Sequence, residues 1–120
     1  MEPKVVRWNA EAEFATPERC SIVETWNDES DSDVSIARAR VEPGITTQLH
    51  VVDVVERYVI VSGRGVVSVG DLPPTPVGAG DAVVIPAGTP QQIANTGQED
   101  LIFYCVCSPR FQPGVYRSLE

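Results

Sequence analysis

Residues 44–63 decide the fold, and they read Gly-Ile-Thr-Thr-Gln-Leu-His-Val-Val-Asp-Val-Val-Glu-Arg-Tyr-Val-Ile-Val-Ser-Gly. The stretch contains His50, the single histidine of the chain, and a carboxylate, Glu56, an even number of positions further on. Side chains an even number of positions apart point to the same face of a β-strand. The valines between them favour extended chain, although Asp53 can interrupt the run with a short turn. We therefore expect His50 and Glu56 to face one interior.

An imidazole and a carboxylate that share an apolar cavity are typical of three arrangements. They form half of a metal site, an acid–base pair or a buried hydrogen bond. In the simplest case, His50 is a core residue whose ring is satisfied by a hydrogen bond to Glu56 or Gln91. No other part of the sequence concentrates so much chemistry, so the functional site is predicted here.

Length and charge exclude several classes of protein. The chain has 120 residues, which is enough for one domain with a buried core. Its formal net charge of -8 at pH 7 argues against binding to nucleic acid or to an anionic membrane, because both demand clustered lysine and arginine. The first residues are charged where a signal peptide needs an apolar core, and no apolar run approaches a membrane span. We expect a cytoplasmic protein.

The three cysteines are odd in number, and the Cys105-x-Cys107 spacing differs from the Cys-x-x-Cys of redox pairs and zinc knuckles. We expect reduced, partly buried thiols at Cys20, Cys105 and Cys107. Phe103 shares the face of Cys105 and Cys107, but the alternation does not say whether this face points inward. A Cys105 that faced His50 could be a nucleophile or a soft ligand, although a small buried apolar role is favoured.

Short β-prone runs separated by glycine and proline turns fill the chain, and no segment has helical periodicity. Strands are predicted at 4–8, 20–26, 34–41, 47–52, 57–62, 66–70, 82–85, 91–95 and 101–107. Residues 27–33 are predicted to form an acidic loop, 71–76 a rigid loop, and 109–120 a tail or closing arm. This pattern favours a closed or double-sheet β architecture, because such folds hide strand edges.

The run 34–41 alternates with period two, so Arg38 and Arg40 share one face and the strand's small residues share the other. An arginine that pointed into a cavity would fix a substrate carboxylate. The outward orientation is favoured, because arginine is seldom buried.

A second block follows at residues 80–95, Gly-Asp-Ala-Val-Val-Ile-Pro-Ala-Gly-Thr-Pro-Gln-Gln-Ile-Ala-Asn. Together, the two blocks resemble the two motifs of the cupin superfamily. Gly44, His50, Glu56 and Gly63 fall at positions of the first motif. The matches to the second motif are Gly80, Pro86, Gly88 and Asn95.

The resemblance implies an all-β protein with a cupin-type double-stranded β-helix, or jelly-roll barrel, which is commonly a homodimer in the family. Residues 1–120 would form a single domain. Its core barrel would span about 34–107, with N-terminal strands in 1–33 and a C-terminal arm in 108–120.

The resemblance also locates a metal site and shows what has changed there. Family members that bind metal use two histidines and the glutamate of the first motif and a histidine of the second. Val52 and Gln91 stand at two of these positions, and valine cannot coordinate a metal. His50, Glu56 and Gln91 could still hold iron, nickel, manganese or zinc, with weak affinity.

Three functions remain open. The favoured one is a barrel that binds a small polar or carbonyl-containing molecule without a tight metal. The second is a metal-dependent dioxygenase, isomerase or cyclase. The third is a metal-free isomerase or lyase in which His50 and Glu56 move a proton at a carbon next to a carbonyl. The residues expected to line the pocket are His50, Glu56, Tyr58, Ile60, Gln91 and Ile93.

Overall fold

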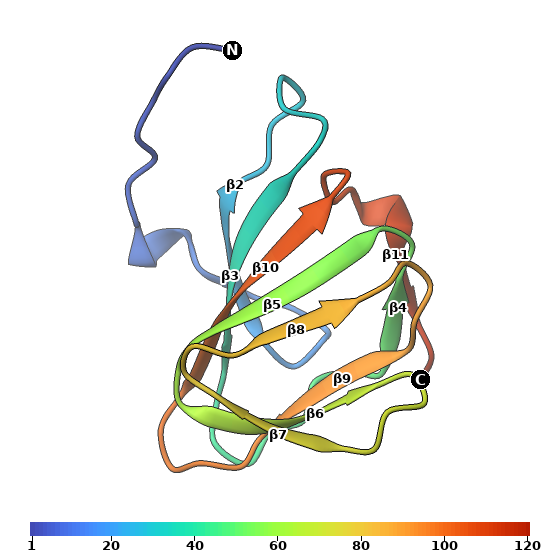
Figure 1. Cartoon of the computed structure of the whole chain (residues 1–120). Helices are drawn as coiled ribbons and strands as arrows, with labels where there is room; N and C mark the ends of the chain where they lie inside the picture. Colours follow the sequence, from blue (N-terminus) through green and yellow to red (C-terminus); the bar gives the residue numbers. More distant parts are fainter.

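Two antiparallel sheets pack face to face in the computed structural model, which describes all residues from 1 to 120 (Figure 1). The six-stranded sheet has the order β1-β2-β3-β10-β5-β8, and the five-stranded sheet has the order β11-β4-β9-β6-β7. Strands distant in sequence are neighbours in both sheets, as in a jelly roll. The predicted all-β, double-stranded β-helix fold is confirmed.

The strands are short, as the turn signals predict. The six-stranded sheet contains β1 (Phe14–Ala15), β2 (Ser21–Trp26), β3 (Ser35–Val41), β5 (Val55–Ser62), β8 (Ala82–Ile85) and β10 (Leu101–Ser108). The five-stranded sheet contains β4 (His50–Val52), β6 (Arg64–Val69), β7 (Thr75–Gly78), β9 (Gln91–Asn95) and β11 (Tyr116–Ser118). Two short 3-10 helices, η1 (Ala10–Ala12) and η2 (Pro113–Val115), precede β1 and β11.

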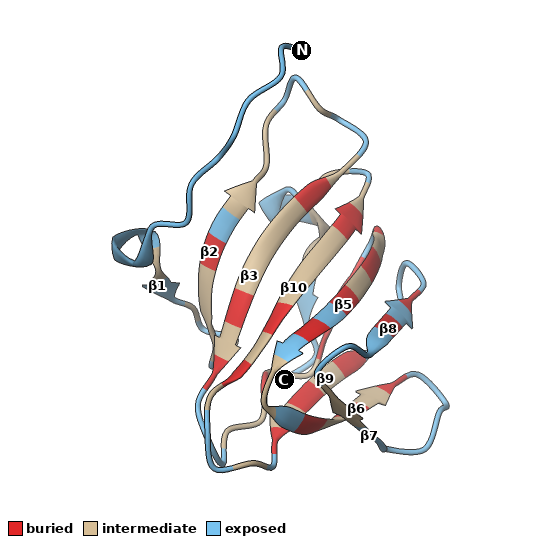
Figure 2. Cartoon of the chain, turned by 60° about the vertical axis from the view of Figure 1, so that its left-hand side comes forward, coloured by how far each residue is buried: buried red, intermediate tan, exposed pale blue.

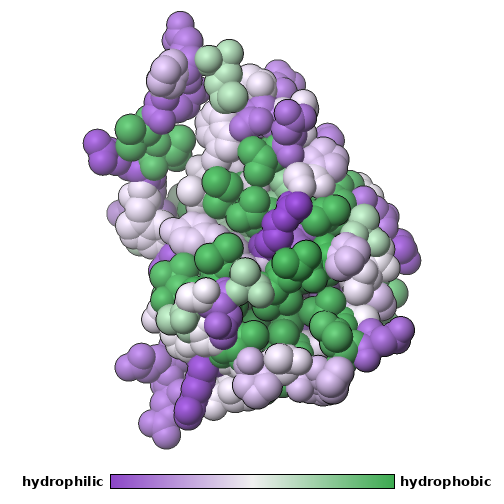
Figure 3. All heavy atoms as spheres, in the orientation of Figure 1, coloured by the Kyte–Doolittle hydropathy of each residue, from purple (hydrophilic) through white to green (hydrophobic).

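Alternation along the strands builds the interior. Buried and more exposed residues alternate along β3, β5 and β10 (Figure 2). On β5, Tyr58 and Ile60 point into the main core cluster, while Val59 and Val61 are exposed on the outer face. Figure 3 shows apolar side chains on this outer face, where Val84 of β8 is also exposed. The period-two pattern therefore fixes which side chains of β5 can reach a site between the sheets.

Turn chemistry joins β5 to β6. Gly63 has φ of +82°, and a Cβ on it would lie 2.6 Å from the carbonyl oxygen of Asp100. Only glycine accepts both the left-handed backbone and this close approach. The tight turn expected here is therefore confirmed, but the predicted hairpin is wrong: β5 and β6 belong to different sheets and do not pair, so the turn carries the chain from one sheet to the other.

Three predicted segments differ from the structure. The strand predicted at 47–52 begins only at His50, as β4. Residues 4–8 form no strand and are all exposed, with Lys4 over the ring of Trp26 at the end of β2. The predicted loop 71–76 is too long, since Thr75 and Pro76 belong to β7, which pairs with β6. Proline is tolerated there because β7 is an edge strand.

The C-terminal segment is a closing arm, since β11 pairs with β4. Its Tyr116 thereby reaches the ring of His50. The three cysteines are free, as expected. The structure holds no helix with the length and apolarity that a membrane crossing requires.

Candidate functional site

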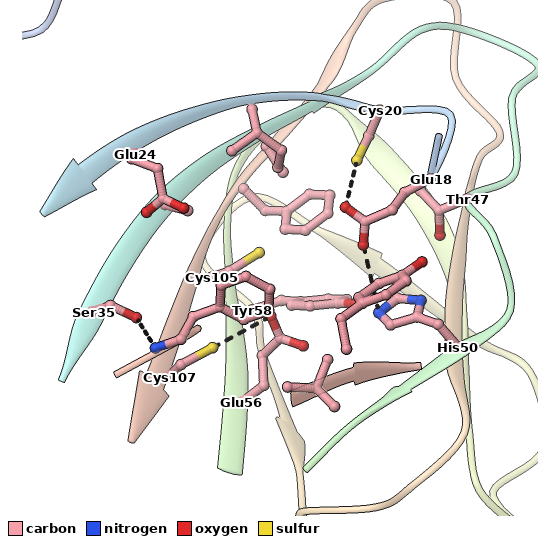
Figure 4. Close-up of a pocket in the computed structure, with 17 residues that line it drawn as sticks. Glu18, Cys20, Glu24, Ser35, Thr47, His50, Glu56, Tyr58, Cys105 and Cys107 are labelled. Carbon is pink, nitrogen blue, oxygen red and sulfur yellow. Dashed lines mark hydrogen bonds and ion pairs between the residues drawn. The ribbon is translucent and has the colours of Figure 1, made fainter. Parts of the chain in front are cut away.

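A cavity of about 90 Å³ lies on the inner face of the six-stranded sheet, and its lining is mostly apolar (Figure 4). Inward side chains of β2, β3, β5 and β10 form one wall. The cavity is completed by His50 and Val52 of β4, by Phe111 in the segment before η2, and by Tyr116 of β11. The prediction that His50 and Glu56 face one interior is confirmed, since both line this cavity.

The small residues of β3 line the cavity, so Arg38 and Arg40 point outward. This is the orientation that the sequence favoured. A guanidinium nitrogen of Arg40 lies 2.7 Å from a carboxylate oxygen of Glu13, and Arg38 stacks over the ring of Trp8. No lysine or arginine lines the cavity. Recognition of a substrate carboxylate by these arginines is therefore excluded.

His50 is held by its own strand segment. Its Nδ1 lies 2.7 Å from the carbonyl oxygen of Gln48, and because a carbonyl can only accept, Nδ1 carries the proton. The ring stacks on Tyr116 with centroids 4.8 Å apart. Nε2 lies 4.0 Å from a carboxylate oxygen of Glu18. The expected hydrogen bond to Glu56 or Gln91 is therefore corrected: Gln48 satisfies the ring, and Glu18 is the carboxyl that faces it.

Glu56 is buried, with 7 % of its surface exposed, and its side chain lines the cavity (Figure 4). Oε2 accepts a hydrogen bond from the Cys107 thiol, at 3.7 Å, whereas Oε1 has no partner. Burial raises the pKa of Glu56, while hydrogen bonding by the side-chain amide of Gln91 and the charge of His50 oppose the rise. The site thus contains a buried carboxyl with one weak hydrogen bond, from a thiol, and no lysine or arginine beside it in the cavity wall.

Glu18 was not predicted as a site residue, because it falls in the segment before the strand at 20–26. Glu18 lies an even number of positions before Cys20, Ile22 and Glu24, and all four side chains line the cavity. Burial raises the pKa of Glu18, and His50 opposes the rise. Extending the alternation of this strand backward would have predicted Glu18 as a site residue.

Tyr116 lies in the closing arm, and no sequence pattern indicated its place in the cavity wall.

The other predicted pocket residues occupy two places. Tyr58 lines the cavity and donates its hydroxyl hydrogen to Oε1 of Gln91. Gln91 is fully buried and does not line the cavity, and its Nε2 has no partner. The structure places Ile60 and Ile93 in the packed core cluster instead of the cavity wall.

The inward face of β10 carries Phe103, Cys105 and Cys107, and Cys20, directly before β2 of the same sheet, lines the same cavity. Burial raises the pKa of the Cys20 thiol to about 12 and holds those of Cys105 and Cys107 above their ordinary value. The thiolate is the reactive form, so these are unreactive apolar wall residues.

We therefore expect Cys20, Cys105 and Cys107 to be alkylated by iodoacetamide at pH 8 at least about tenfold more slowly in the folded protein than in urea. Because its thiol pKa is about 12, the rate at Cys20 should keep rising with pH well above pH 9. Peptide mass spectrometry after timed quenching measures each site separately. A cysteine alkylated equally fast in both conditions would contradict its burial in the wall.

The donor set does not fit a tightly held metal ion. No group of three or more His, Cys, Asp or Glu side chains is arranged to hold one. Val52 contributes only methyl groups, and the carbonyl oxygen of Gln91 already accepts the Tyr58 hydroxyl. Only His50 and Glu56 remain of the set that the resemblance implies.

Comparisons with known proteins agree with this architecture. The model of the cupin domain family matches residues 37–107. Streptomyces PAC13, solved as a variant with uridine, has a TM-score of 0.78 and 19% identity, covering 100% of this chain and 93% of that one. An uncharacterised double-stranded β-helix protein from Klebsiella pneumoniae has a TM-score of 0.75 and 20% identity, covering 92% of both chains.

A predicted oxalate decarboxylase from Thermotoga maritima has a TM-score of 0.68 and 28% identity, covering 75% of this chain and 80% of that one. No curated protein sequence matches the chain. The similarities under 25% identity concern the fold alone.

Proposed function

Because this chain belongs to the cupin domain family, whose model spans residues 37–107, we propose that it binds a small polar organic molecule in its barrel cavity without a tightly held metal ion. One observation carries the proposal: Oε1 of Glu56 is buried beside the cavity and has no hydrogen-bond partner. A buried polar atom without a partner costs about 1–3 kcal/mol. A ligand that donates a hydrogen bond to this atom would remove that cost.

The dimensions of the cavity limit the ligand. Its volume of about 90 Å³ is smaller than the roughly 150 Å³ of an engineered cavity that holds benzene. We therefore propose that the enclosed part of the ligand has about six non-hydrogen atoms or fewer. Apolar side chains form most of the wall, so polar contacts are few and decide the orientation of the ligand.

The oxalate named for the Thermotoga maritima relative is not a substrate that we propose for this chain. Oxalate is a dianion, and a site for it needs positive charge. Here the wall holds Glu18, Glu24 and Glu56, and no lysine or arginine. Like charges facing a bound dianion in a buried site would weaken its binding.

Titration of ¹⁵N-labelled protein with acetamide, urea and dihydroxyacetone tests the proposal, because each probe fits the enclosed volume and carries hydrogen-bonding groups. We expect saturable shifts of the backbone amides of Glu56 and Cys105 with at least one probe, and at least about tenfold weaker binding in Glu56→Ala. Glu29→Ala, an exposed glutamate in a loop, is the matched control and should bind as the wild type does. If no probe gives saturable shifts at the cavity, the proposal fails.

A second function is favoured by the tautomer of His50. Since Nδ1 carries the proton, Nε2 holds a free lone pair that can take a proton from a ligand. Removing a proton from a carbon next to a carbonyl would leave an enolate and a protonated His50, whose charge the carboxylate of Glu18, 4.0 Å from Nε2, would stabilise. Deuterium exchange into dihydroxyacetone in D₂O, followed by NMR, tests this function. His50→Ala should lower the catalysed rate by about a hundredfold or more, and exchange no faster than in buffer would rule out the function.

A further inference from the structure

We propose that the ligand of the cavity is a small organic cation, of the amidinium, guanidinium or ammonium type, whose charged N–H groups bind the carboxylate of Glu56. This inference rests on the proposed function and goes further by assigning the charge of the ligand. It follows from three features of the wall: its excess of carboxyl groups, the unused oxygen of Glu56 and the aromatic rings beside them.

The carboxyl groups of the wall outnumber the groups that can neutralise them. Glu18, Glu24 and Glu56 all line the cavity, and His50 is the only wall residue that can become positive. The arginines of β3, which could have supplied charge, are turned to the outer face, where Arg40 pairs with Glu13. A protonated His50 would neutralise one carboxylate, and Glu18 is the one that faces it. No wall cation is left for Glu56.

Glu56 is the residue that the cation would contact. More than nine-tenths of its surface is buried, and Oε1 makes no hydrogen bond of normal geometry. The neighbouring donor is the side-chain amide of Gln91, which lies outside the cavity wall. Its other oxygen receives only a weak thiol hydrogen bond from Cys107. Burying an unpaired carboxylate is costly, and a charge-assisted N–H bond compensates much of that cost. The same site offers nothing to attract an anion.

The remaining wall suits the rest of such a molecule. Phe103 packs against Tyr58 with ring centroids 4.6 Å apart, and both rings line the cavity with Phe111 and Tyr116. Aromatic faces attract organic cations, and their apolar area covers the carbon atoms of the ligand. Carboxylates beside aromatic rings, with Glu56 buried and Glu24 at the exposed side of the cavity, are the chemistry that selects a cation over a neutral molecule of the same shape.

Three isosteric probes separate charge from shape: acetamidinium, acetamide and acetate have the same planar skeleton and carry positive, zero and negative charge. Their affinities at pH 7 are compared by NMR titration of the intact protein. We expect acetamidinium to bind at least about tenfold more tightly than acetamide, and acetate to bind most weakly. In Glu56→Gln the preference for acetamidinium over acetamide should fall to about twofold or less.

Glu29→Gln is the matched control, because it removes the same formal charge from an exposed loop, and it should keep the wild-type preference. If acetamide binds as tightly as acetamidinium, the cation inference fails while the binding function stands. If none of the probes binds, both fail. If acetamidinium is preferred and Glu56→Gln keeps that preference, the role assigned to Glu56 is wrong.

Discussion

Glu56→Gln is expected to raise the free energy of unfolding of the ligand-free protein at pH 7 by about 1–3 kcal/mol. The side chain is buried, no lysine or arginine lines the cavity beside it, and burial raises the pKa of its carboxyl. Glutamine has nearly the same shape, still offers an oxygen to the Cys107 thiol, and removes the cost of holding a charge in the interior. A stabilising substitution in the wall of a cavity is the pattern expected of a site maintained for binding.

The pH dependence gives this prediction its sign. A carboxyl whose pKa is higher in the folded than in the unfolded chain binds more protons when folded, so its contribution to stability is fully present below the unfolded value, about 4.3. That contribution is lost as the pH rises through the raised folded pKa. The advantage of Glu56→Gln should therefore be large at pH 7 and shrink towards pH 4.

Urea unfolding followed by circular dichroism at both pH values measures the difference. Glu29→Gln, on the surface, should change the free energy of unfolding by less than about 0.5 kcal/mol at either pH. A Glu56→Gln variant that is less stable than the wild type at pH 7 would mean that the ionised carboxylate is compensated in the folded protein. The interpretation of its free oxygen would then be wrong.

Asn95→Ala is expected to lower the free energy of unfolding by about 3 kcal/mol or more. Asn95 ends β9 with 2 % of its surface exposed. Its Nδ2 donates to the carbonyl oxygens of Val41 and Glu99, both at 2.8 Å, and its Oδ1 accepts the N–H of Gly97 at 2.9 Å. Alanine would remove all of these bonds and leave buried backbone groups without partners.

The same urea experiment tests this prediction, with Gln98→Ala as the control because Gln98 is exposed in the same turn. The control should lose less than about 0.5 kcal/mol. Asn95→Asp should not rescue stability, since it would set a carboxylate against two carbonyl oxygens. Equal, small losses in Asn95→Ala and Gln98→Ala would show that the turn does not depend on these bonds.

The fold could be predicted because its signals are local. Gly63 and Gly88 have positive φ where turns were expected, and period-two alternation gave the inward faces of β3 and β5. The strand predicted at 4–8 is absent, because a β-prone composition alone does not make a strand without pairing to a neighbour. The homodimer expected from the resemblance stays a prediction.

The site was predicted only in part, for a related reason. His50 and Glu56 were found because alternation within one stretch puts them on one side. The inward face of Cys105 depends on where β10 lies between β3 and β5, which its own sequence does not state. Tyr116 reaches His50 only through the pairing of β11 with β4, a long-range contact without a local signal.

The central claim is that the cavity binds a small polar molecule by its own side chains, without a metal ion. The most direct test measures acetamidinium and acetamide binding to protein stripped with a chelator, and again after adding one equivalent of iron, nickel, manganese or zinc, with the metal content determined by elemental analysis. We predict far less than one metal ion per chain and the same affinities in all samples. A stoichiometric metal that is lost in His50→Ala and Glu56→Ala, with binding only when it is present, would contradict the claim.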